Sequence, residues 1–69
     1  MNGAALTVQD ILLNDDATVS VQRADDDTFV VHAQRTWLDC LTETKLLRMG
    51  YKSQYIGNMH IRVFPLGLK

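Results

Sequence analysis

Hydrophobic and polar residues follow two different periods along this chain of 69 residues, and these periods predict its elements. In residues 17–23 and 28–34, apolar side chains recur at every second position, which is typical of half-buried β-strands. In residues 36–50 they recur at helical spacing instead, in the only segment that is long and apolar enough for a substantial helix. Residues 51–56 and 59–64 return to the strand pattern. The chain therefore predicts two β-hairpins separated by a central helix.

The register of the first hairpin follows from its loop. A three-residue loop at Asp25–Asp27 keeps the apolar side chains of both strands on one face, whereas a two-residue loop mixes the faces. We therefore expect three facing pairs, which are Val21 with Val31, Val19 with Ala33, and Arg23 with Phe29.

The second hairpin is expected to turn at Gly57-Asn58, because glycine at the first central position favours a type II′ turn. This register puts one set of side chains in the core, namely Ile56, Met59, Ile61 and Val63. It puts aromatic and basic side chains together on the opposite face, namely Tyr51, Tyr55, His60, Arg62 and Phe64.

The central helix is apolar on two sides. Thr36 is the expected N-cap, Asp39 completes a capping box, and Gly50 ends the helix. One side, expected to face the sheet, carries four apolar residues, namely Trp37, Cys40, Leu41 and Leu47. The other side carries Leu38, Leu46 and Met49. A helix that packs against a single layer needs only one apolar stripe, so a second element must cover the second side.

Two alternatives remain for the element that packs over Leu38, Leu46 and Met49. A short helix at residues 7–14 offers Ile11, Leu12 and Leu13, and it would complete the monomer core. Another chain would make these residues a protein interface, with Trp37 as an aromatic anchor. Residues 1–6 and 66–69 are expected to be flexible tails.

Together these elements predict a single α+β domain over residues 1–69, in the order α-β-β-α-β-β. The simplest packing for this order is an antiparallel sheet with the central helix and the short N-terminal helix on one face.

Composition and charge narrow the class of protein. The single cysteine excludes an intramolecular disulfide and a cysteine-rich zinc site, which favours a reducing compartment. No segment resembles a signal peptide or a membrane span, so we expect a cytoplasmic protein that does not contact the membrane. Residues 1–34 hold six aspartates against one arginine, a net charge of −5, whereas residues 35–69 carry +4. Such a polarised chain suits association with a copy of itself or with a basic partner.

The sequence gives little support for a catalytic site or for a metal site. Cys40 with His32 or His60 contains the elements of a nucleophile and a base, but Cys40 is expected in the core, and no oxyanion site accompanies it. Asp25, Asp26 and Asp27 lack the spacing of a calcium loop, so we interpret them as a solvated turn that presents an acidic knob. We expect no catalytic residue, no metal and no cofactor.

The sequence therefore favours a non-enzymatic regulator, adaptor or inhibitor that acts by stoichiometric protein–protein binding, as a homodimer. Its size suits a phage- or plasmid-encoded protein. The alternative is a nucleic-acid-binding module that uses the aromatic and basic face of the C-terminal hairpin, since interleaved aromatic and basic side chains on a sheet suit single strands. The mild negative net charge argues against this alternative.

Overall fold

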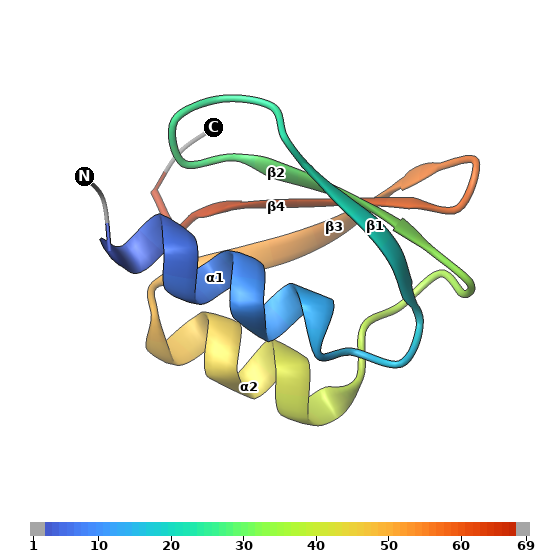
Figure 1. Cartoon of the computed structure of the whole chain (residues 1–69), viewed down its shortest axis with the longest axis horizontal. Helices are drawn as coiled ribbons and strands as arrows, with labels where there is room; N and C mark the ends of the chain where they lie inside the picture. Colours follow the sequence, from blue (N-terminus) through green and yellow to red (C-terminus); the bar gives the residue numbers. More distant parts are fainter. Residues whose placement is uncertain (1–2, 68–69) are drawn as a thin grey trace.

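The computed structural model describes residues 3–67 as an α+β domain of two layers, a four-stranded antiparallel sheet and two helices that cover one of its faces (Figure 1). The elements follow the predicted order: α1 (Gly3–Leu13), β1 (Thr18–Arg23), β2 (Phe29–Ala33), α2 (Cys40–Arg48), β3 (Tyr51–Gly57) and β4 (His60–Pro65). The predicted fold class is thereby confirmed.

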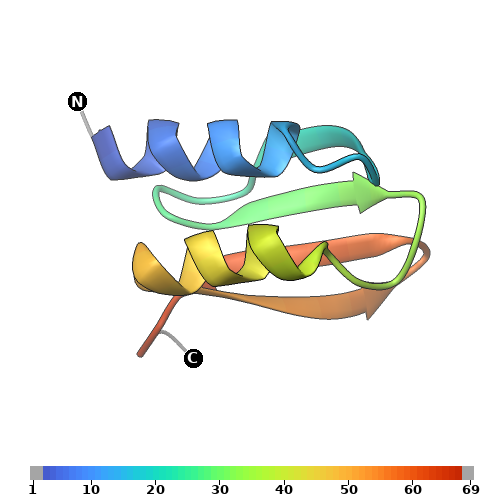
Figure 2. The same ribbon diagram turned by 90° about the horizontal axis from the view of Figure 1, so that it is seen from below.

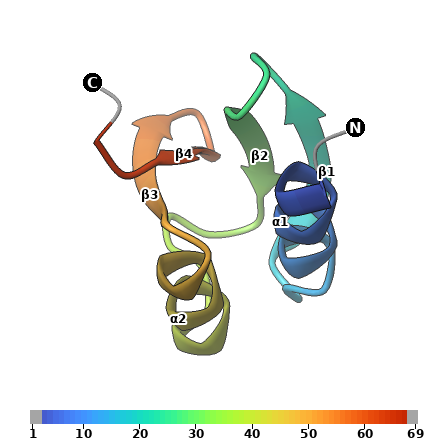
Figure 3. The same ribbon diagram turned by 90° about the vertical axis from the view of Figure 1, so that its left-hand side faces the viewer.

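The strand order β1-β2-β4-β3 makes the fold two similar halves. Each half is a helix followed by a β-hairpin, and the two hairpins join through antiparallel pairing of β2 with β4 at the centre of the sheet. Viewed from one end, α1 lies beneath β1 and α2 lies beneath β3 (Figure 3). One face of the sheet is therefore covered by helices, and the other face is open.

The core fills the space between the sheet and the two helices, which lie in front of the sheet when it is seen from below (Figure 2). Strands β2, β3 and β4 give it buried side chains, and β1 adds the partly buried Val21. The buried cluster comprises Val8, Leu12, Phe29, Val31, Ala33, Leu38, Leu46, Tyr51, Ile61 and Val63. Burial of this apolar surface is the main force that holds a domain of this size together.

The N-terminal helix is longer than predicted. It begins at Gly3, so residues 3–6 are helical and do not form the loose tail that we expected. The prediction began this helix at residue 7. In the structure Val8 and Leu12 lie one helical turn apart on the buried face, and the helix continues for a further turn on the N-terminal side of Val8. Residues 1–2 and 68–69 of the expected tails lie outside the described residues.

The central helix is shorter than predicted and begins at Cys40. Its N-cap is Asp39, whose Oδ2 accepts a hydrogen bond from the Leu41 amide at 3.3 Å, and Thr36 precedes the helix. Aspartate is a strong N-cap because its side chain satisfies one of the amides that the first turn leaves unpaired. Gly50, at φ 81°, follows the helix as expected.

The buried and exposed sides of α2 are the reverse of those predicted. Leu38 and Leu46 are fully buried, and Met49 packs against the core, so the prediction that these residues form a protein interface is wrong. Trp37, Cys40, Leu41 and Leu47, which we expected to face the sheet, are all exposed. The helix is apolar on two sides, as predicted, but the uncovered side is the one that we expected to face the sheet.

The register of the first hairpin is confirmed for two of its three pairs, Val21 with Val31 and Arg23 with Phe29. The third pair is wrong, because a bulge between Thr18 and Ser20 shifts the register and leaves Val19 half exposed. Thr18 takes the expected place of Val19 opposite Ala33. The extra residue bends the strand at the edge of the sheet.

The second hairpin turns one residue later than predicted. Asn58 and Met59 are its central residues and both have positive φ, which a type I′ turn requires, whereas the prediction placed a type II′ turn at Gly57-Asn58. Gly57 pairs with His60, and a bulge between Tyr55 and Gly57 shifts the register of the rest of β3 by one residue. Tyr55 therefore faces Ile61, on the helix-covered side of the sheet.

Candidate binding surfaces

The open face of the sheet is a regular grid of side chains. Because directly paired residues of neighbouring strands point to the same side of a sheet, the strand pairings fix which residues share this face. One row contains Ser20, His32 and His60, and the next contains Gln22, Val30, Arg62 and Gln54. Phe64 and Lys52 pair at the far end of the face.

This open face is basic and aromatic. The imidazole rings of His32 and His60 stack across β2 and β4, with centroids 5.0 Å apart and planes inclined by 15°. The guanidinium carbon of Arg62 lies 4.6 Å from the centroid of the Phe64 ring, a cation–π contact. Lys52 is exposed beside them, and no carboxylate stands in any of the three rows. The mild negative charge of the chain therefore resides elsewhere on the molecule.

The prediction of an aromatic and basic face is correct for three residues and wrong for two. His60, Arg62 and Phe64 lie on the open face, whereas Tyr51 is buried in the core and Tyr55 lies on the helix-covered side. The cause is the bulge between Tyr55 and Gly57, because a shift of one residue in the pairing moves every β3 side chain before it to the other face.

The same slip explains which residues of the face the sequence analysis missed. It brings the polar residues Lys52 and Gln54 of β3 onto the open face, in place of the tyrosines. His32 joins from β2, through a pairing with β4 that the two separate hairpin patterns did not specify. The alternation of Lys52 and Gln54 with Tyr51, Ser53 and Tyr55 was the available signal, and only its assignment to a face was wrong.

The outer surface of α2 is the second candidate surface. Leu41 is 66% exposed and Leu47 is 55% exposed, and the free thiol of Cys40 is also exposed. At 3.6 residues per turn these three residues lie across the half of the helix that faces away from the buried Thr42 and Leu46. Trp37, 61% exposed, lies in the segment that leads into the helix.

Trp37 is held in place by the arginine beside it. The Nε of Arg35 donates to the Trp37 carbonyl oxygen at 3.0 Å, and the guanidinium carbon lies 5.6 Å from the indole centroid. The indole thus stays on the surface with a defined orientation, although the prediction placed it on the sheet-facing side of the helix.

The acidic knob at Asp25–Asp27 is a braced loop. The Arg23 guanidinium donates to the carbonyl oxygens of Asp25 and Asp26, the shortest of these bonds being 2.6 Å. The Tyr51 hydroxyl donates to the Asp27 carboxylate, and burial together with this anion raises the pKa of Tyr51, against a smaller effect of Arg23. Asp25 and Asp26 are exposed. The loop is thus a turn with one anchored and two solvated carboxylates.

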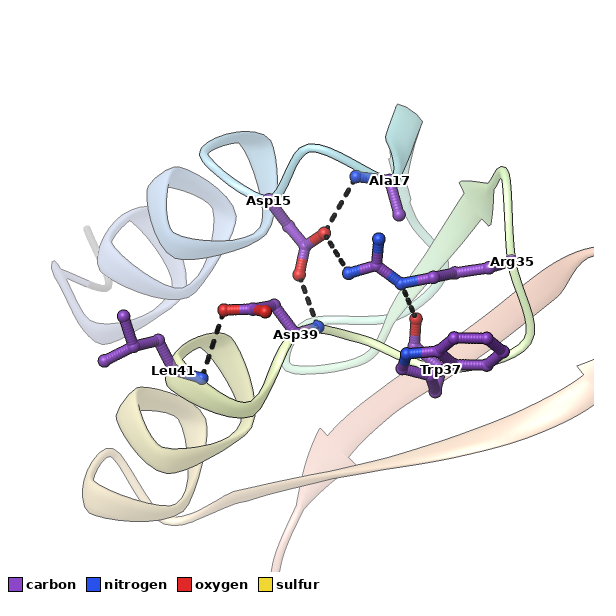
Figure 4. A network of polar contacts seen from close by, with 6 residues as sticks. All are labelled: Asp15, Ala17, Arg35, Trp37, Asp39 and Leu41. Carbon is purple, nitrogen blue, oxygen red and sulfur yellow. Dashed lines mark hydrogen bonds and ion pairs between the residues drawn. The ribbon is translucent and has the colours of Figure 1, made fainter.

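A buried carboxylate connects the two helices (Figure 4). The Asp15 side chain is 0% exposed, and its two oxygens accept from the Ala17 amide at 2.9 Å and the Asp39 amide at 2.8 Å. Arg35 Nη2 lies 3.4 Å from Oδ1, and the Thr42 hydroxyl also donates. Burial alone raises the pKa of Asp15, but the hydrogen bonds and the guanidinium outweigh it and lower the pKa below its usual value. This cluster is a structural clamp, because every oxygen contact fixes backbone or neighbouring side chains.

The elements of a catalytic pair do not come together. Cys40 lies on α2, which covers one face of the sheet, whereas His32 and His60 lie on the opposite face. Among residues 3–67, no group of three histidine, cysteine, aspartate or glutamate side chains is arranged to hold a metal ion. None of the helices in this part of the chain is long and apolar enough to cross a membrane.

These features define a small two-layer α+β protein with one open sheet face and one exposed apolar helix surface. Comparison with protein-family models, with curated proteins and with solved structures finds no match to this chain.

Proposed function

We propose that this protein is a small cytoplasmic, non-enzymatic regulator, adaptor or inhibitor that acts by stoichiometric protein–protein binding, and that its first partner is a second copy of itself. The observation that carries this proposal is the outer surface of α2, where Leu41 and Leu47 are more than half exposed. Covering such side chains removes apolar surface from water, which is the main driving force of protein association.

The charges of α2 favour a second copy as the occupant. Glu43 lies in the first turn, whereas Lys45 and Arg48 lie in the last turn. A dimer whose two-fold axis is perpendicular to α2 packs the two helices antiparallel, and the basic end of each helix then lies beside the acidic end of its partner. The polarised halves of the chain, −5 and +4, support the same arrangement.

The test is the mass of the protein in solution, measured by sedimentation equilibrium and light scattering over a wide range of concentrations. We expect a dimer for the natural chain and a monomer for Leu47→Asp, because an aspartate in the contact loses its hydration without gaining a partner. Leu13→Asp is the matched control, since Leu13 has the same exposed fraction of 55% but lies on α1.

The outcomes of this experiment either support or refute a dimer that forms through α2. A folded Leu47→Asp monomer beside a Leu13→Asp dimer supports the α2 interface. A natural chain that remains monomeric at every concentration refutes self-association, and loss of the dimer in both variants refutes the location on α2. Circular dichroism verifies that both variants are folded, as expected for substitutions at exposed positions.

A further inference from the structure

We propose that the open face of the sheet binds single-stranded nucleic acid, laid along β4, in addition to the protein contact proposed for α2. The face has two properties that this ligand requires. Its permanent charges, on Arg62 and Lys52, are both positive, and its planar groups are arranged in two pairs, His32 with His60 and Arg62 with Phe64. Proteins bind single-stranded nucleic acid with cationic side chains beside its phosphates and planar side chains against which its bases stack.

The first stacking platform is the pair of histidines. Their planes differ by only 15°, so a base placed on either ring continues an existing stack. The His60 ring is oriented by its Nδ1, which donates to the Asn58 carbonyl oxygen at 2.8 Å. A platform held in this way loses little side-chain entropy when a base binds.

The second platform is the guanidinium of Arg62, which lies over the Phe64 ring. Arginine planes stack with bases as aromatic rings do, and the ring beneath keeps the guanidinium in position. His60, Arg62 and Phe64 alternate along one strand, so the two platforms follow each other along β4 at intervals of about 6.6 Å. Lys52, paired with Phe64 from β3, supplies a further contact for phosphate.

The geometry favours a single strand over a duplex. In a duplex the bases stack on each other and are not available to the two platforms. Reading a duplex requires an element that enters a groove, and the open face is a sheet surface with no projecting helix. It also favours nucleic acid over an acidic protein, because an acidic chain would use the charges and leave the stacked planes unused.

The experiment measures fluorescence anisotropy of labelled oligo-dT and oligo-U, with a duplex of the same length as a third probe. We expect both single strands to bind and the duplex to bind much more weakly. If the charges of Lys52 and Arg62 each neutralise one phosphate, Arg62 while it stacks on a base, the slope of log K against log salt is about −1.4, and affinity falls about sevenfold between 50 and 200 mM salt. Lys52→Gln should reduce this slope to about −0.7, whereas Lys45→Gln on α2 should leave it unchanged.

The stacking is tested by Phe64→Leu, which keeps the apolar bulk and removes the aromatic plane. We expect about a tenfold loss of affinity for oligo-dT with the salt slope unchanged. Trp37→Ala removes an aromatic ring that is exposed elsewhere on the molecule, and its affinity should equal that of the natural chain. Leu47→Asp should also bind normally as a monomer, so failure of the protein interface and failure of this site give different results.

Several results would overturn the proposal. One is a folded protein that binds neither single strand at 50 mM salt, and another is equal affinity for the duplex. A third is a Phe64→Leu variant that binds as tightly as the natural chain. The last is poly-glutamate displacing oligo-dT with an affinity that Phe64→Leu does not change, which would make the face a receptor for acidic protein chains.

Discussion

The strongest prediction for stability concerns the buried carboxylate of Asp15. Replacing it with alanine removes the acceptor of two backbone amides, those of Ala17 and Asp39, and leaves the buried Ala17 amide without its partner. An unsatisfied buried donor costs about 1–3 kcal/mol, and hydrogen bonds to a charged group are worth about 1.5–3 kcal/mol each. Asp15→Ala should therefore lower the free energy of unfolding by about 3 kcal/mol.

That loss is large for a domain of this size. A single small core rarely supplies more than about 3–5 kcal/mol of net stability, so the variant should be close to unfolded at room temperature. Each kilocalorie shifts the melting temperature of a 60–100-residue domain by about 4–8 °C, so we expect a decrease of about 15 °C or more. Circular dichroism measures the free energy of unfolding in a urea titration and the melting temperature in a thermal scan. Asp16→Ala is the matched control, because Asp16 is the exposed neighbour in the same turn.

The pH dependence gives an independent test of the same clamp. The pKa of Asp15 is lowered by its hydrogen bonds and by Arg35, so the folded state holds the carboxylate more strongly in its ionised form than the unfolded chain does. Its contribution to stability is therefore complete above the unfolded pKa of about 3.9 and is lost as the pH falls through the lower folded pKa. Asp15→Asn should show a flatter dependence of stability on pH below about 4 than the natural chain.

Two results would refute this reasoning. If Asp15→Ala and Asp16→Ala are equally stable within about 0.5 kcal/mol, the carboxylate is not a clamp. If Asp15→Asn loses stability in acid as steeply as the natural chain, other carboxylates account for the acid sensitivity.

Two further variants test the acidic loop. Tyr51→Phe should lower the free energy of unfolding in urea by about 1.5 kcal/mol, because it removes the hydroxyl that donates to Asp27 and keeps the buried ring. An unchanged stability would show that this hydrogen bond contributes nothing. Replacing Asp25 and Asp26 together by asparagine should leave stability within about 0.5 kcal/mol, because both are exposed turn residues. The same double variant should bind oligo-dT more tightly, because the loop lies just before Phe29, which pairs with Val63 next to Phe64, and its negative charge repels phosphate. Weaker binding would contradict the proposed site.

Local pattern was sufficient for the fold class and for much of the first hairpin. Alternation in the two strands, together with the length of the Asp25–Asp27 loop, leads directly to the pairing of Val21 with Val31. The bulge at Val19 was not predictable in this way, because the alternation of apolar and polar residues continues through it without interruption. The turn at Asn58-Met59 escaped for a similar reason, since methionine rarely adopts positive φ and gives no turn signal.

The orientation of α2 depends on a contact far away in the sequence. With apolar residues on two sides of the helix, the local pattern gives no reason to bury Leu46 in preference to Leu47. Asp15 supplies that reason, because its carboxylate binds the Asp39 amide and the Thr42 hydroxyl and so turns this side of the helix inward. Leu46, one helical turn after Thr42, is buried as a consequence. The helical pattern within residues 36–50 carries no information about a contact with Asp15, which lies more than twenty residues earlier in the sequence.

The two proposed surfaces lie on opposite sides of the molecule, and this separation is itself testable. Leu47 is on α2 in the helix layer, whereas Phe64 is on the open face of the sheet. Changes at such sites are usually additive. The double variant Leu47→Asp with Phe64→Leu should therefore be a monomer with the same tenfold loss of affinity for oligo-dT as Phe64→Leu alone. If oligo-dT binding instead depends on dimerisation, Leu47→Asp alone will weaken it, and the nucleic-acid site must then be composed of two chains.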